Sequence, residues 1–328
     1  MRTILQSFAV CVVLLGTWHL TVNRLPTKYR VGGNVGSQQE QNVIRGETFV
    51  YANQQPRVVV VGSSIANRLK DLPRDWFNLS FNGGSAFTGL EIIARADKRP
   101  KVVLIETNML LLPADDQQLR QLFTPGVYQA RRRLAFLAET NKPHLVAQRA
   151  LIEGDERTSS PARPAPGGSW SSPTEPAEPD AAETALSREQ YESLSARRAG
   201  ELADAIDANA LDRIVADLKY HVVNLEKRGV EVVFFEMPEH SDFADAPRPT
   251  SVRRKLKDAF PEDRYAWVPD ADRGTYRTTD FVHLTAAGSK RYAELLKSFL
   301  STQLPTKESK LPATAGKETA PAPSARVE

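Results

Sequence analysis

The sequence predicts an α/β fold in which a mostly parallel sheet lies between two layers of helices. Continuous apolar runs, such as Arg57 to Val61 and Gly229 to Glu236, are typical of strands that are buried on both faces. Segments with one apolar face at helical spacing follow these runs. Alternating strands and helices favour a parallel sheet that is covered on both sides, which makes a three-layer sandwich.

Four strands and a short helix are expected in chain order. The strands are residues 57–61, 76–81, 101–106 and 229–236, and Gly62 and Pro238 end the first and the last. A short helix is expected from Ser64 to Leu69, directly after the first strand.

Three longer helices are predicted in the C-terminal half. One ends at Gly229 as its C-cap, and its apolar face comprises Leu211, Ile214, Val215, Leu218, Val222 and Leu225. A more polar helix begins with Ser187 and Gln190 as a capping box. The last helix has Thr285 as its N-cap, and its apolar face comprises Tyr292, Leu295, Leu296 and Phe299.

Residues 1–24 are predicted to form a membrane anchor. Ile4 to Val22 is mostly apolar and close to the length of about 20 residues that a spanning helix needs. A signal peptide needs an apolar core of only roughly 7–15 residues and fits as well. No clear cleavage site follows, so an uncleaved anchor is favoured. The positive charges after this segment favour a cytoplasmic body, whereas the very short leading tail favours export.

The remaining boundaries follow from composition. Residues 25–54 are expected to be a polar stem and residues 55–302 the α/β domain, with a disordered Pro/Ser/Ala/Gly-rich insertion at about 157–183 and a disordered tail at 303–328. The formal net charge of +3 gives no general attraction to nucleic acid. Cys11, the only cysteine, lies in the anchor, which excludes a cysteine nucleophile or Cys-based metal site in the domain. No metal or cofactor is expected.

Polar residues follow the predicted strands at the edge where open α/β sheets bind ligands. Gly62-Ser63-Ser64 follows the first strand and Glu106-Thr107-Asn108 ends the third. Asp280 and His283 precede the last helix, and their spacing lets the carboxylate bind the far nitrogen of the imidazole and fix its tautomer.

The order of these motifs, serine, then asparagine, then Asp-x-x-His, resembles the SGNH (GDSL-like) hydrolase superfamily, whose fold is flavodoxin-like. The resemblance implies that Ser64 is the nucleophile, with His283 as its base and Asp280 orienting the base. It also implies an oxyanion hole formed by the N–H groups of Ser64 and Gly83 and the side-chain amide of Asn108. Three positions depart from the family pattern: Ser63 replaces aspartate, Glu106 replaces glycine and Met109 replaces aspartate.

The anchored SGNH pattern resembles exopolysaccharide O-acetyltransferases and the D-alanylation factor of lipoteichoic acid synthesis. This resemblance implies an extracytoplasmic acyltransferase or esterase that acts on envelope polysaccharide beside a membrane O-acyltransferase. A non-catalytic scaffold that binds polysaccharide or that acyltransferase is the alternative, and a soluble lipase or thioesterase is a third. Arg131-Arg132-Arg133 is interpreted as a solvated helix face, with attraction to an acidic polymer or to lipid headgroups as the other interpretation.

Overall fold

The computed structural model describes residues 1–26, 35–52, 55–96, 98–156, 188–271 and 276–303. A five-stranded sheet forms the centre, with strand order β2-β1-β3-β4-β5 and every neighbouring pair parallel. The strands are β1 (Val58–Gly62), β2 (Trp76–Ser80), β3 (Val102–Glu106), β4 (Glu231–Phe235) and β5 (Ala266–Trp267). The predicted α/β sandwich is confirmed, and its four predicted strands correspond to β1 to β4.

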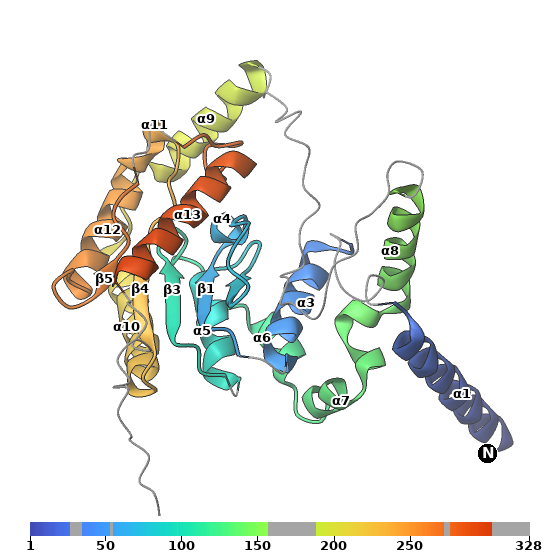
Figure 1. Cartoon of the computed structure of the whole chain (residues 1–328). Helices are drawn as coiled ribbons and strands as arrows, with labels where there is room; N and C mark the ends of the chain where they lie inside the picture. Colours follow the sequence, from blue (N-terminus) through green and yellow to red (C-terminus); the bar gives the residue numbers. More distant parts are fainter. Residues whose placement is uncertain (27–34, 53–54, 97, 157–187, 272–275, 304–328) are drawn as a thin grey trace, which may run out of the picture.

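Helices cover both faces of the sheet (Figure 1). On one face α4 (Ser64–Asn67) and α13 (Ala286–Gln303) pack against alternate strand residues such as Val60, Leu104 and Phe235. On the other face pack α3 (Gln38–Tyr51), α5 (Ala86–Arg95), α6 (Asp116–Phe123), α10 (Ala208–Lys227) and α12 (Pro247–Ala259). The β-branched side chains of β1 are buried on both sides, as its unbroken apolar run predicts.

The remaining helices lie around this sandwich. Before the gap at 157–187 are α7 (Val127–Arg133), the 3₁₀ turns η1 (Ala135–Leu137) and η2 (Glu139–Asn141), and α8 (Pro143–Glu156). After it are α9 (Arg188–Leu202) and α11 (Ser241–Ala244). Helix α1 (Arg2–Arg24) is long and apolar enough to cross a membrane, a property that a signal sequence shares.

Two predicted helix ends are confirmed. Gly229 has a φ of +72°, and the N–H groups of Gly229 and Val230 donate to the carbonyls of Glu226 and Leu225, which is a Schellman motif that ends α10. The hydroxyl of Thr285 accepts the N–H of Gly288 at 3.0 Å, as an N-cap of α13 does. The predicted Ser187 capping box lies outside the described residues, as do the insertion at 157–183 and the tail from residue 304.

The prediction of a polar stem over residues 25–54 is wrong for its second half. Residues 38–51 form α3, which begins with a capping box between Ser37 and Glu40 and packs Val43, Phe49 and Val50 into the core. The apolar residues of this segment are few, so composition suggested a stem. The capping box was the available signal for a helix. Strand β5 was also missed, because two residues are too short for any period to show.

Candidate active site

The candidate site lies at the carboxyl edge of the sheet, where the chain direction across the sheet reverses. From β1 the chain crosses to β2 on one side and then to β3 on the other. Open α/β sheets bind ligands at such a switch point. Ser64 follows β1 and Asn108 follows β3, so the fold brings two of the predicted site residues to this crevice.

Ser64 is the first residue of α4, and the surrounding residues leave its N–H free. The hydroxyl of Ser63 accepts the N–H of Ile65 at 3.1 Å, and the carboxylate of Glu106 accepts those of Ser63 and Ala66 at 2.7 and 3.3 Å. The first N–H groups of a helix have no intrahelical acceptor. Among the four from Ser63 to Ala66, the N–H of Ser64 alone has no acceptor within the described residues. It is therefore available to a ligand.

Ser64, His283 and Asp280 form one chain of hydrogen bonds. Nε2 of His283 lies 2.9 Å from Oγ of Ser64, and Nδ1 of His283 lies 2.7 Å from Oδ2 of Asp280. The carboxylate can only accept, so Nδ1 carries the proton and Nε2 accepts the hydroxyl of Ser64. This is the tautomer that a general base for Ser64 requires.

Asp280 is held as a carboxylate. Its burial by itself would raise the pKa, but the hydrogen bonds from the ring and the backbone N–H of His283, and from the N–H of Val282, outweigh burial. The net effect holds the pKa of Asp280 below its usual value of 3.8. Its negative charge is therefore present at neutral pH to orient and stabilise the imidazole.

Contacts between α4 and the start of α13 bring together residues that are far apart in sequence. The guanidinium of Arg68, at the end of α4, donates to the hydroxyl of Thr279 at 3.3 Å, and the hydroxyl of Ser289 in α13 donates to the carbonyl of Arg68. Thr278 pairs with Leu284 in an antiparallel bridge, which closes the segment that carries Asp280 and His283. These contacts fix the imidazole beside Ser64.

Phe281, between Asp280 and His283, has a backbone conformation that costs energy. Its φ is +70°, a region that bulky residues rarely adopt, at a cost of roughly 1–3 kcal/mol. The ring is buried among Tyr191 of α9, His240 and Phe243, with ring centroids 4.7 to 5.4 Å apart. The N–H of His240 also donates to the carbonyl of Phe281 at 3.0 Å. Packing therefore holds the turn that presents His283.

Glu106 lies beneath the Ser64 turn and was not predicted as a site residue. Besides the two N–H groups named above, its carboxylate accepts the hydroxyl of Ser63 at 2.9 Å. A Cβ on Gly62 would collide with this carboxylate, so glycine is needed at that position. Two departures from the family pattern, Ser63 and Glu106, thus bind each other. The departures themselves were the signal that could have identified this pair.

Glu106 is fully buried, and burial is the largest influence on its ionisation. Burial raises its pKa to about 7, although the hydrogen bonds from Ser63 and Ala66 act in the opposite direction. The nearby carboxylate of Glu239 raises it further. A titratable group therefore lies directly behind the Ser64 turn and changes charge near neutral pH.

Gly83 occupies the turn after β2, next to α4. It has a φ of +70°, and its N–H makes no hydrogen bond to the residues that the structure describes. The neighbouring side chain of Asn82 accepts the amide of Asn67 in α4 at 2.7 Å. The turn that carries Gly83 is therefore tied to the helix that Ser64 begins.

Asn108 has partners that the sequence does not reveal. Its Oδ1 accepts the N–H of Met237 at 2.8 Å, and its Nδ2 donates to the carbonyl of Met237 at 3.0 Å and to Glu239 at 3.2 Å. Both amide hydrogens thus have acceptors. Arg198 of α9 binds the other oxygen of Glu239 at 3.1 Å. Asn108 can donate to a ligand only after one of these bonds is released.

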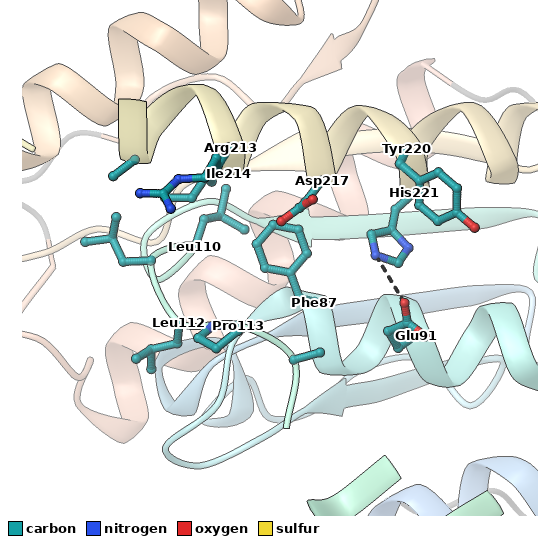
Figure 2. Close-up of a pocket in the computed structure, with 13 residues that line it drawn as sticks. Phe87, Glu91, Leu110, Leu112, Pro113, Arg213, Ile214, Asp217, Tyr220 and His221 are labelled. Carbon is teal, nitrogen blue, oxygen red and sulfur yellow. Dashed lines mark ion pairs between the residues drawn. The ribbon is translucent and has the colours of Figure 1, made fainter. Parts of the chain in front are cut away.

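Two hollows flank the loop that follows β3. A cavity of about 190 Å³ lies beside Asn108 and is lined by Arg198, Glu236, Glu239 and Arg253, among others. A larger hollow of about 630 Å³ lies between α5 and α10, where Figure 2 shows Glu91 and His221 facing each other. None of the predicted site residues lines this larger hollow. Among the described residues, no three His, Cys, Asp or Glu side chains are grouped to hold a metal ion.

Solved structures that are similar to this chain include the following two. A GDSL-like lipase from Bacteroides thetaiotaomicron VPI-5482 has 12% sequence identity and a TM-score of 0.41, over 81% of this chain and 100% of its own. A structure from Streptococcus pneumonia, named for platelet activating factor, has 12% identity and a TM-score of 0.37, over 89% and 99%. No protein-family model and no curated protein matches the sequence. At these scores neither likeness bears on function, which is inferred from the site geometry.

Proposed function

We propose that this chain is a membrane-anchored serine acyltransferase or esterase of the SGNH (GDSL-like) type. The observation that carries the proposal is the hydrogen-bond chain from Ser64 through His283 to Asp280, with links of 2.9 and 2.7 Å. Side chains more than 200 positions apart meet in the order and tautomer that activation of a serine requires. A solvated histidine without such a role has no reason to hold this geometry.

The reaction begins with attack of Oγ of Ser64 on the carbonyl carbon of an ester, while Nε2 of His283 takes the hydroxyl proton. Asp280 stabilises the imidazolium that forms. The free N–H groups of Ser64 and Gly83 are assigned to the developing oxyanion. Asn108 adds a third donor once Glu239 releases its amide. One such donor is worth roughly 2.7–4 kcal/mol in the transition state.

The acyl-enzyme forms when the tetrahedral intermediate collapses and His283 returns its proton to the leaving alcohol. In the second half, His283 takes a proton from a sugar hydroxyl or from water, and that oxygen attacks the acyl carbon. The bond from the acyl carbon to Oγ of Ser64 then breaks, and His283 returns the proton to Oγ. The first outcome is acyl transfer and the second is hydrolysis. The same residues serve both, so the acceptor decides between them.

We assign O-acyl groups, O-acetyl above all, of envelope or extracellular polysaccharide as the substrate class, and a membrane O-acyltransferase as the donor partner. Helix α1 supports this assignment because it is long and apolar enough to anchor the site at a membrane surface. The domain is assigned to the extracytoplasmic side. No cofactor enters the proposed reaction.

A fluorophosphonate probe tests the nucleophile. Labelling should be lost in Ser64→Ala. It should be retained in Ser63→Ala, because the hydroxyl of Ser63 binds Glu106 and not His283. Labelling that survives Ser64→Ala would contradict the assignment. No labelling of folded wild-type protein would favour the non-catalytic scaffold, an alternative that the engaged amide of Asn108 supports.

Hydrolysis of p-nitrophenyl acetate, with and without an oligosaccharide acceptor, separates the two reactions. Acetylated oligosaccharide that forms at the expense of free acetate indicates a transferase. Unchanged release of acetate in the presence of the acceptor indicates an esterase.

A further inference from the structure

The region between α6 and α8 packs against the C-terminal end of α1. Nε1 of Trp18 in α1 donates to the carbonyl of Asn141 at 3.1 Å, and the rings of His19 and Phe136 lie 5.3 Å apart. Val22 is fully buried. Figure 1 shows α7 on the side of the domain towards which the free N-terminal part of α1 extends. The last turns of α1 therefore have a fixed position beside η1.

The exposed part of α1 is too short to cross a bilayer by itself. Residues 2–17 are all exposed, and contacts with the rest of the chain begin at Trp18. At about 1.5 Å per residue this part spans roughly 24 Å, whereas the hydrocarbon core is about 30 Å thick. A spanning α1 therefore brings the elements packed around Trp18 to the level of the lipid headgroups, or several ångströms below.

The surface of α7 and η1 has the chemistry of an interfacial segment. Val127, Leu134 and Leu137 are 43%, 39% and 37% exposed. Arg132 and Arg133 are exposed beside them and have no ion-pair partner within the described residues. Apolar side chains next to free arginines are typical of segments that lie at the surface of anionic membranes.

Arg131 shows that the three adjacent arginines are not equivalent. It points into the domain and binds Glu47 at 2.9 Å, a carboxyl group whose pKa is raised to about 7, chiefly by burial. Only Arg132 and Arg133 remain for an external anion. The interpretation of the three arginines as a solvated helix face is therefore wrong for Arg131, whereas Arg132 and Arg133 are exposed.

We propose that residues 127–137, here called the α7–η1 segment, rest in the headgroup region of the bilayer that α1 spans. Leu134 and Leu137 enter the boundary with the acyl chains, and Arg132 and Arg133 bind lipid phosphates. The domain is then held at the membrane at two places. The proposal rests on α1 remaining in the membrane and is independent of the acyl chemistry.

Spin labels report this placement directly. Cys11 is the only cysteine, so Cys11→Ser gives a background for Leu134→Cys and Leu137→Cys. Val223→Cys is the matched control, because Val223 is 40% exposed and lies on α10, away from α1. The full-length variants are reconstituted in vesicles of phosphatidylcholine and phosphatidylglycerol, at about three to one, to supply anionic headgroups.

Labels at 134 and 137 should be more accessible to oxygen than to a water-soluble nickel chelate, as expected within about 5–10 Å of the headgroup boundary. The label at 223 should show the reverse. Arg132→Glu with Arg133→Glu should make the label at 137 more accessible to nickel. Equal nickel accessibility at 134, 137 and 223 would overturn the proposal, as would failure of the full chain to float with the vesicles. Fluorophosphonate labelling, measured separately, shows whether the acyl chemistry stands.

Discussion

The Ser64 turn and the Asn108 corner occupy neighbouring strand ends, yet they use their polar groups in opposite ways. At the Ser64 turn, the distant carboxylate of Glu106 accepts the N–H groups of Ser63 and Ala66, and the neighbouring hydroxyl of Ser63 accepts that of Ile65. The N–H of Ser64 has no acceptor among the residues that the structure describes. At the Asn108 corner, the whole amide is engaged by Met237 and Glu239. A carboxylate decides each case: Glu106 binds neighbouring N–H groups and leaves that of Ser64 open, while Glu239 occupies the predicted oxyanion donor. A motif thus fixes where a residue lies, and its neighbours fix what it can donate.

The largest expected effect is at the Ser64 turn, where the hydrogen-bond chain through His283 to Asp280 is complete. Asp280→Asn should lower kcat for ester hydrolysis by about 10⁴, because an amide does not hold the imidazole in the required tautomer. Steady-state kinetics measure this loss. Thermal unfolding of the same variant checks that the protein remains folded. A loss of less than tenfold would show that His283 does not depend on Asp280.

Asn108→Ala tests the Asn108 corner. The N–H and carbonyl of Met237 would lose their partner, so the free energy of unfolding should fall by roughly 1–3 kcal/mol. If the amide also serves the oxyanion, kcat should fall by about 10²–10³, the result that we expect. Urea unfolding and kinetics on the same preparation separate the effects. Lost stability with unchanged kcat would leave Asn108 as a structural residue only.

Glu106→Gln tests whether the buried carboxyl group of Glu106 makes the stability depend on pH. The folded pKa of about 7 lies above the usual 4.5, so between these values the folded state keeps a proton that the unfolded state has lost. The free energy of unfolding should therefore fall as pH rises from 4.5 to about 7 and level off above. Glu47, also with a pKa of about 7, acts in the same direction.

Urea unfolding across this pH range measures the effect. Glu106→Gln should remove one part of the decline, and Glu47→Gln is the matched control that removes the other. An identical decline in wild type and Glu106→Gln would show that Glu106 does not titrate in this window.

The smallest expected effect concerns α9. Tyr191→Ala removes a ring 4.7 Å from Phe281, which should cost about 0.5–1.5 kcal/mol of stability. We expect a few-fold lower kcat, because the turn presenting His283 is less firmly held. Tyr220→Ala, which removes the more exposed ring at 64% on α10, is the control. Equal kinetic effects of the two variants would contradict a role for α9 in positioning the site.

The elements that were predicted correctly have local signals. Each of these signals involves residues that are close together in sequence. They are the unbroken apolar run of β1, the apolar face of α10 with the glycine after it, and the three-residue spacing of Asp280 and His283. The stem prediction failed over α3 because its apolar residues are sparse and its stability comes from packing on a sheet that composition does not describe.

The sequence by itself determined strands β1 to β4, helices α4, α10 and α13, the apolar α1 and the positions of Ser64, Asp280 and His283, since each depends on periodicity or short spacing. Only the tertiary structure decided that His283 meets Ser64, that Glu106 caps the Ser64 turn and that Asn108 binds Met237 and Glu239. The reason is that these hydrogen bonds join residues about 40 to 220 positions apart. Which donor reaches which acceptor is then set by how strands and helices pack, and no local pattern encodes it.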